Sequence, residues 1–196
     1  MDELLALLGQ VVDVPEELKE HLMKIMIPLD FKYKSFLSKP GRVNDKAFYI
    51  IKGLVRCYTI HKGQDYLKEY ELNKWFKFDG DLITSSESFE RQIPSTEYFQ
   101  ALKPTAVLMT TFEELAKIYK KWPVFYQVGH YLASQHAQFE DHVSDMLRLP
   151  SQKERYEYLL TNLPYLNERV PQKYLATFMG MEPTTLSKIK AARPSQ

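Results

Sequence analysis

The stretch Arg169–Ala191, RVPQKYLATFMGMEPTTLSKIKA, contains two short helical patterns separated by Gly180. Ala176 is small at a point where a second helix must cross closely, and a glycine takes the positive φ of a tight turn without a steric cost. Five apolar residues fall at the positions that pack two such helices together: Leu175, Met179, Met181, Leu186 and Ile189. This spacing predicts a helix-turn-helix.

The second helix of this motif presents short donors and cations, which suit base edges and phosphates. Pro183 is tolerated in its first turn, because an N–H at that position would have no partner within the helix. We expect sequence specificity to rest on residues 183–190 and phosphate contacts to come from both helices. The candidate DNA-binding residues are Arg169, Gln172, Lys173, Pro183, Thr184, Thr185, Ser187, Lys188 and Lys190. An ordinary αα-hairpin at the end of a helical domain is the alternative interpretation of the pattern.

The distribution of charge favours the same end of the chain as the site of nucleic-acid contact. The 196 residues carry a formal net charge of +1. Residues 148–196 hold eight Lys or Arg and four Glu, a net charge of +4, which leaves −3 for residues 1–147. A basic C-terminal segment behind a mildly acidic body fits a protein whose partner is double-stranded DNA.

Composition limits the location of the protein and its chemistry. No apolar run approaches the roughly 20 residues of a membrane span, and the acidic start MDELLALLGQ lacks the basic region of a secretory signal. The single Cys57 excludes an internal disulfide and a four-cysteine zinc or iron–sulfur site, and the five histidines form no metal-binding motif. Nucleophile motifs such as G-x-S-x-G are absent. We therefore expect a cytoplasmic protein that is not an enzyme and holds no metal.

The first two thirds of the chain change from a helical to a strand-like pattern. Residues 2–10 and 15–27 read as helices, whereas residues 29–111 alternate short β-branched and aromatic runs with Gly, Pro, Asn and Asp. A hairpin turn is expected at residues 61–64. Short strands without intervening helices predict an antiparallel barrel or jelly roll, which can enclose one small ligand. The expected fold class is therefore α+β.

A long helix is predicted from residue 124 to about residue 147. Its apolar or near-apolar positions recur alternately every three and every four residues. This 3.5-residue period is typical of a coiled-coil seam, here about three heptads long. The predicted seam residues are Phe125, Val128, Leu132, Gln135, Phe139, His142 and Met146.

A second helix start follows this long helix. Ser151 and Glu154 have the spacing of a capping box, directly after Pro150. We therefore place the domain boundary near residues 148–151. The predicted parts are a β-roll domain at 1–123, a long helix at 124–148 and a helix-turn-helix domain at 149–196.

This order of elements resembles the Crp/Fnr family of bacterial transcription regulators over nearly the whole chain. The most specific similarities are the segment AFYIIKGLVRCY around Gly53 and the motif PQKYLATFMGMEPTTLSKI. The resemblance implies a cyclic-nucleotide-binding-like β-roll that senses an effector. It also implies a homodimer that places two recognition helices in successive major grooves of a near-palindromic operator. RNA polymerase is a further partner that this resemblance suggests.

Three departures from the family pattern limit what the resemblance carries over. Members that bind cyclic nucleotides have an Arg that neutralises the cyclic phosphate, but here no Arg follows Pro94, and Glu97 would repel a phosphate. An anion without its charge partner loses several kcal/mol, so we do not expect tight binding of cyclic AMP. Cys57 alone cannot hold the iron–sulfur cluster of oxygen-sensing members. The base-reading positions also differ, with Pro183, Thr184 and Lys188 in place of two Arg and a Glu, so the operator sequence does not carry over.

The loop that would bind an effector keeps several polar side chains. The candidate contacts for an unknown small molecule are Asp81, Ser85, Ser86, Glu87, Ser88, Ser95 and Thr96. A solvated loop is the alternative, since loops are commonly polar on their own account. For the whole chain, the alternative function is a small-molecule-binding β-roll that uses its C-terminal helical domain for protein contact.

Overall fold

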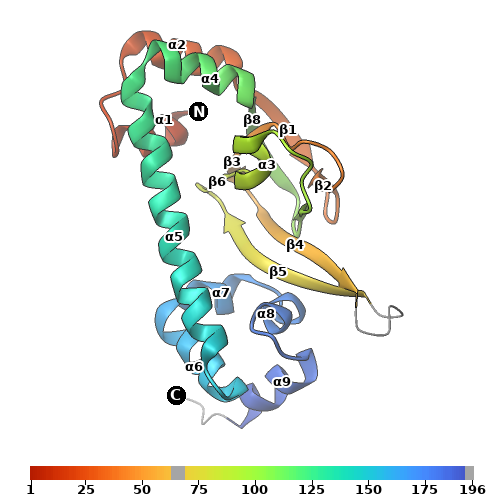
Figure 1. Cartoon of the computed structure of the whole chain (residues 1–196). Helices are drawn as coiled ribbons and strands as arrows, with labels where there is room; N and C mark the ends of the chain where they lie inside the picture. Colours follow the sequence, from red (N-terminus) through yellow and green to blue (C-terminus); the bar gives the residue numbers. More distant parts are fainter. Residues whose placement is uncertain (63–68, 193–196) are drawn as a thin grey trace. The chain divides into compact units, whose positions relative to one another are not determined.

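The computed structural model describes residues 1–62 and 69–192 (Figure 1). In the described ranges helices are followed by strands and then by further helices, which confirms the α+β class. The hairpin turn expected at residues 61–64 lies partly outside the described residues. None of the described helices is long and apolar enough to cross a membrane.

The chain forms two compact units. Unit 1 consists of Met1–Cys57 and Lys77–Gln135, and unit 2 consists of Tyr58–Phe76 and His136–Gln196. These bounds differ from the three-part division expected from the sequence, because a piece of the strand region belongs with the C-terminal helices. The long helix is likewise shared between the units.

Within the described residues, the strands form two four-stranded sheets with the orders β1-β8-β3-β6 and β2-β7-β4-β5. The pairs β1–β8, β3–β8, β3–β6 and β2–β7 are antiparallel, as the alternating sequence pattern predicted. The strands are β1 Ile27–Phe31, β2 Phe36–Ser38, β3 Lys46–Lys52, β4 Leu54–Lys62, β5 Glu69–Phe78, β6 Leu82–Ile83, β7 Tyr98–Ala101 and β8 Thr105–Thr111. The helix α3, Ser86–Arg91, follows β6.

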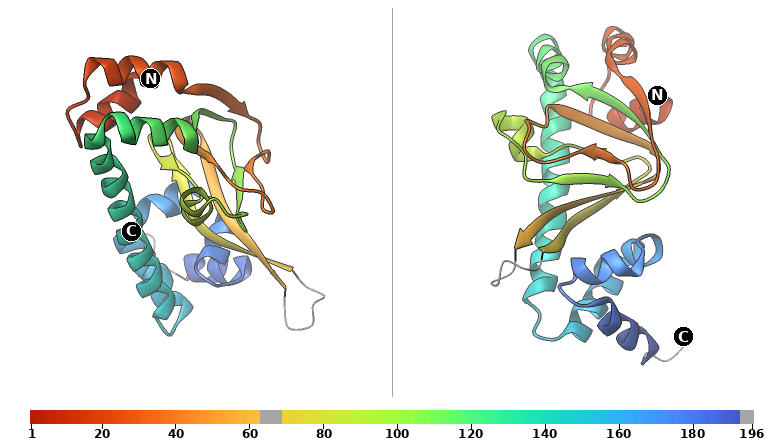
Figure 2. Two further views of the ribbon diagram at one scale, coloured as in Figure 1. Left: turned by 45° about the horizontal axis from the view of Figure 1, so that its top comes forward. Right: turned by 90° about the vertical axis from the view of Figure 1, so that its right-hand side faces the viewer.

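Helices gather at one end of the roll and close its core (Figures 1 and 2). These are α1 Asp2–Gly9, α2 Glu16–Ile25, α4 Phe112–Lys121 and the short 3-10 helix η1 Pro123–Phe125. Leu18 and Leu22, one turn apart on α2, are buried in the same cluster as Tyr49 of β3, Leu108 of β8 and Ile118 of α4. The helices are therefore part of the folding core of unit 1, since each buried aliphatic side chain contributes about 1.5–3 kcal/mol.

Helix α5, Tyr126–Arg148, runs from unit 1 into unit 2. Four further helices complete unit 2: α6 Gln152–Asn162, α7 Pro164–Arg169, α8 Gln172–Phe178 and α9 Pro183–Ala191. The predicted capping box is present at the start of α6, where the Ser151 hydroxyl accepts the Glu154 N–H at 3.2 Å and the Glu154 carboxylate accepts the Ser151 N–H at 3.0 Å.

Candidate nucleic-acid interface

The turn between α8 and α9 has the geometry that the sequence predicted. Gly180 has φ +67°, in the left-handed region. The N–H of Met181 donates to the carbonyl of Ala176 at 3.0 Å, and the N–H of Gly180 donates to the carbonyl of Thr177 at 3.2 Å. These two bonds form a Schellman motif, which ends α8 and redirects the chain into α9.

The apolar positions of the motif pack as expected. Leu175, Met179, Met181 and Leu186 are buried and Ile189 is half-buried, while the small Ala176 is completely enclosed. Because one face of α9 is held in this way, only its opposite face is available to a nucleic acid.

Arg155 of α6 fastens the turn to the end of α5, a role that the sequence pattern did not reveal. Its Nε donates to the carbonyl of Leu149 at 3.1 Å, and its Nη1 donates to the carbonyl of Met179 at 3.3 Å. A Cβ at Gly180 would lie 3.1 Å from the same Nη1. The space taken by Arg155 is thus a second reason, besides φ, for glycine at this turn.

The outer face of α9 carries three of the predicted base-contacting side chains. Thr184, Ser187 and Lys188 are exposed, whereas Pro183 and Thr185 are half-buried. The helix sequence PTTLSKIKA contains no carboxylate that would repel a phosphate. Hydroxyl and ammonium donors on one exposed helix face can bind both base edges and phosphate oxygens.

Lys190 occupies a different environment from Lys188. Its ammonium lies 5.6 Å from the centre of the Tyr156 ring, in the geometry of a cation–π contact. Burial lowers the pKa of the Lys190 ammonium. Lys190 therefore helps to pack α9 against α6.

The other predicted phosphate contacts lie around the junction of α7 and α8. Arg169 is the last residue of α7, and Gln172 is the first residue of α8. Arg169 and Lys173 are exposed, Gln172 is half-buried, and the Lys173 ammonium lies 5.6 Å from the ring centre of Tyr174. These side chains thus belong to the elements that precede α9, in the same unit.

Three of the four serines predicted to bind an effector form hydrogen bonds within the protein itself. The Ser85 hydroxyl donates to the Glu97 carboxylate at 2.6 Å and lies 3.2 Å from the Ser95 hydroxyl. The Ser95 hydroxyl also accepts the N–H of Glu97 at 3.0 Å. Ser88 donates to the carbonyl of Ile93 at 2.6 Å. The Glu97 carboxylate, absent from the predicted contact set, therefore accepts a bond that an anionic effector would otherwise accept.

The remaining predicted effector contacts do not converge on one point. Asp81 accepts the N–H of Phe78 at 2.7 Å and so closes a turn. Ser86, Glu87 and Thr96 are exposed, and Glu87 forms an ion pair with Arg91 at 2.9 Å. The polar side chains of this loop thus divide into a buried network and a solvated surface.

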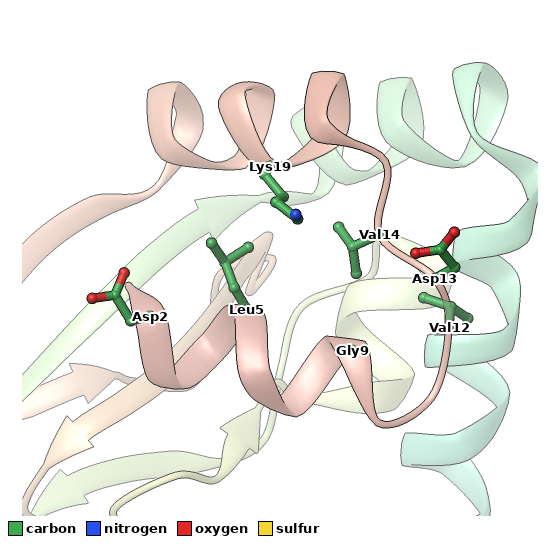
Figure 3. A pocket seen from close by; sticks show the side chains of 7 residues that line it. All are labelled: Asp2, Leu5, Gly9, Val12, Asp13, Val14 and Lys19. Carbon is green, nitrogen blue, oxygen red and sulfur yellow. The ribbon is translucent and has the colours of Figure 1, made fainter.

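Two surface hollows in unit 1 lie apart from this loop. One, of about 440 Å³, is lined by Asp2, Leu5, Gly9, Val12, Asp13, Val14 and Lys19 of the N-terminal helices (Figure 3). The other, of about 540 Å³, is lined by Val11, Tyr126, Gln127, His130, Tyr131 and Ser134. The predicted effector residues line neither of these hollows.

Of the seven positions predicted to form a dimer seam, three are buried by this chain itself, three are half-buried and one is exposed. Phe125, Val128 and Met146 are only 5%, 3% and 0% exposed and leave no surface for a partner helix. Leu132 is half-buried beside the core of unit 1. Phe139 stacks on the ring of Phe178, with 6.2 Å between ring centres. Of the other two seam positions, His142 lies 3.2 Å from the hydroxyl of Tyr158, and Gln135 is exposed.

Metal-binding side chains do not gather in the part of the chain that the structure describes. Within residues 1–62 and 69–192 there is no group of three or more His, Cys, Asp or Glu side chains placed to hold a metal ion. Cys57 is completely buried in β4.

No protein-family model and no curated protein sequence matches the chain. Solved structures, however, resemble its fold. The c-di-GMP-responsive regulator CLP of Xanthomonas campestris has a TM-score of 0.68 at 14% identity, over 88% of each chain. A CooA variant of Carboxydothermus hydrogenoformans has a TM-score of 0.66 at 17% identity, over 92% of this chain and 83% of CooA.

A transcriptional regulator of the Crp/Fnr family from Eubacterium rectale has a TM-score of 0.66 at 14% identity. The similarity covers 90% of this chain and 82% of that regulator. Sequence identities this low show only that the folds are alike, so any inference about binding rests on the residues described above. The protein therefore has the fold of the Crp/Fnr transcription regulators.

Proposed function

We propose that the chain is a DNA-binding transcription regulator of Crp/Fnr type that acts without catalysing a reaction. The observation that carries this proposal is the exposed face of α9, where Thr184, Ser187 and Lys188 stand on a helix held by the buried core of the motif. The net charge of +4 in residues 148–196 gives this end of the chain an attraction for phosphates. Such a regulator acts on transcription by contacting RNA polymerase.

The regulator is a homodimer, and the face of α5 opposite the packed stripe forms the contact. Tyr126, His130, Ala133 and Ala137 follow one another at intervals of four, three and four residues, and all four are exposed. Tyr126 is 62% exposed. The small alanines allow two helices to approach closely, and the hollow beside Tyr126 and His130 offers a concave surface to a partner helix.

The DNA target is identified by selecting bound duplexes from a random pool, with and without a cell extract of small metabolites. Enrichment of a near-palindromic sequence is expected, because a twofold dimer reads two half-sites about one helical turn apart. Affinity for the selected duplex should fall steeply from low to moderate salt, because phosphate contacts release counterions. A protein that enriches no sequence and binds duplexes without salt dependence would instead use its C-terminal unit for protein contact.

Replacing Lys188 with alanine is expected to weaken binding of the selected duplex by roughly 1–3 kcal/mol if its ammonium pairs with a base edge. The measurement is fluorescence anisotropy with a labelled duplex. Lys153→Ala is the control, since it removes another exposed ammonium, ion-paired with Glu157 at 3.9 Å, from α6 of the same unit. Equal losses of duplex affinity for the two variants would contradict a base contact by Lys188.

Cyclic AMP is expected not to bind tightly. No Arg stands between Pro94 and Lys103 to pair with its phosphate, and the Glu97 carboxylate already accepts the Ser85 hydroxyl. Titration calorimetry with cyclic AMP should therefore show no binding in the micromolar range. Adenosine, which lacks the phosphate, is the control. Binding of adenosine but not of cyclic AMP would indicate that Glu97 repels the phosphate, whereas binding of neither would indicate a general loss of nucleoside recognition. A micromolar dissociation constant for cyclic AMP would contradict this account of the loop.

A further inference from the structure

The two strands β4 and β5 join the units of the protein. The chain crosses from one unit to the other after Cys57 in β4, after Phe76 in β5 and after Gln135 in α5. We use the term distal ribbon for the described residues of these strands that belong to unit 2, namely 58–62 and 69–76. The two strands are hydrogen-bonded neighbours in one sheet.

Asn73 of the distal ribbon is hydrogen-bonded to α8, the first helix of the helix-turn-helix. The side-chain amide of Asn73, which is 8% exposed, donates to the Thr177 hydroxyl at 2.6 Å and reaches the carbonyl of Tyr174 at 3.4 Å. The Thr177 hydroxyl in turn donates to the carbonyl of Tyr174 at 3.1 Å. The hydroxyl proton is thus used within α8, and the lone pairs of the oxygen are left to accept from the ribbon.

An aromatic contact reinforces this hydrogen bond. Phe76 of β5 meets the ring of Phe178 edge-on, with 5.6 Å between ring centres. Phe178 also stacks against Phe139 of α5 at 6.2 Å. Phe76 and Phe178 are both 2% exposed, so these contacts belong to the core of unit 2. Aromatic pairs of this kind contribute beyond the area that they bury.

The contacts of α8 extend to α9. Leu175 and Ala176, which lie directly before Thr177, are completely buried within the helix-turn-helix. Any shift of α8 must therefore move α9 or open this packing. The bond of 2.6 Å is sensitive to such a shift, since a donor and acceptor separated by about 3.6 Å no longer form a hydrogen bond.

We propose that the distal ribbon holds the helix-turn-helix in the arrangement that binds DNA. Asn73 is the positioning residue, because it holds α8 and, through α8, also α9. This rests on the proposed function. Because the same two strands continue into the roll, a change in the roll reaches the helix-turn-helix along β4 and β5 as well as along α5. Asn73 acts through Thr177 and makes no contact with DNA.

The test compares Thr177→Val with Thr177→Ser. Valine has nearly the shape of threonine but cannot accept the Asn73 amide, whereas serine keeps the hydroxyl. Affinity for the duplex selected above, measured by anisotropy, should fall about tenfold in Thr177→Val, because the buried Asn73 amide loses its 2.6 Å hydrogen bond to α8 and keeps only the longer contact, 3.4 Å, with the carbonyl of Tyr174. Thr177→Ser should remain within about twofold of the wild type. Equal affinity of Thr177→Val and the wild type would overturn the proposal.

The fluorescence of Trp75 separates positioning from simple stability. Trp75 lies in the distal ribbon, and the chain has two tryptophans, so Trp122→Phe leaves Trp75 as the only tryptophan, which is excited selectively over the tyrosines. In that background the duplex should change the Trp75 emission, and adding Thr177→Val should abolish the change. A variant that unfolds more easily but keeps both the duplex affinity and the Trp75 response would show that the bond is merely structural and refute its positioning role.

Hydrogen exchange supplies a measurement that needs no DNA. In Asn73→Ala the amides of residues 175–178 should exchange at least fivefold faster than in the wild type, as expected for a helix that loses an anchor. Unchanged exchange would refute the ribbon contact even if the wild type bound no duplex. Failure of the wild type to bind any duplex, combined with faster exchange in Asn73→Ala, would refute the proposed function and the positioning role that rests on it, and would leave only the anchor itself.

Discussion

Replacing Gly53 with alanine is expected to lower the free energy of unfolding by roughly 4 kcal/mol, a large part of the stability of a typical domain. Gly53 connects β3 to β4 with φ +142°, a conformation that costs other residues about 1–3 kcal/mol. A Cβ at this position would also lie 2.7 Å from both Cβ and Cγ2 of Thr105. Thr105 is buried and its hydroxyl donates to the carbonyl of Lys103 at 2.9 Å, so it has little freedom to move. Overpacking of this kind adds about 1–3 kcal/mol.

Gly41→Ala provides the matched control for this prediction. Gly41 also has a positive φ, +91°, but a Cβ there would meet no atom within 4 Å. Chemical denaturation of both variants should therefore show a clearly smaller loss for Gly41→Ala, limited to the backbone term. Equal losses would mean that Thr105 moves aside and that the backbone conformation alone requires glycine.

Replacing Ala137 with glutamate is expected to break the proposed dimer. The substitution places two carboxylates against each other across the twofold axis, and like charges brought together at an interface cost several kcal/mol. The dimer should therefore dissociate at protein concentrations at least about 100-fold higher than the wild type, as measured by analytical ultracentrifugation. Duplex affinity should fall by a comparable factor, because each half-site then binds a separate monomer.

Gln135→Glu is the control that distinguishes the two faces of α5. Gln135 belongs to the seam predicted from the sequence, whereas Ala137 belongs to the exposed face opposite the packed stripe. Both side chains are exposed, and both variants add one carboxylate to the same helix. If Gln135→Glu dissociated the dimer and Ala137→Glu left it intact, the dimer contact would instead be the stripe predicted from the sequence.

The elements that could be predicted best depend on contacts between residues close in the sequence. The capping box of α6 needs only Ser151 and Glu154, and the turn of the helix-turn-helix needs Gly180 and the helix ends beside it. The strands of the roll followed from alternating side chains and turn residues. In each case the energy that decides the structure acts within a few residues, so the pattern is visible in one stretch.

The stripe on α5 shows where such reasoning stops. Its 3.5-residue period correctly indicated that one face of the helix is buried. The pattern did not show what covers that face. In the structure, Phe139 stacks on Phe178 and Val128 joins the core of unit 1. Burial removes the same apolar surface from water whether the covering atoms belong to this chain or to a second copy. A periodic pattern therefore cannot identify what covers it.

The sequence alone established the α+β class, the helix-turn-helix and its polar outer face, because propensities, turn residues and periodicity act locally. Tertiary structure decided which of the polar residues remain free to act. Lys190 lies against Tyr156, Ser85 donates to Glu97, and Arg155 fastens the turn. It also placed Asn73, from strand β5, against Thr177 of α8. These contacts join residues far apart in the chain, and only the folded arrangement brings their atoms within bonding distance.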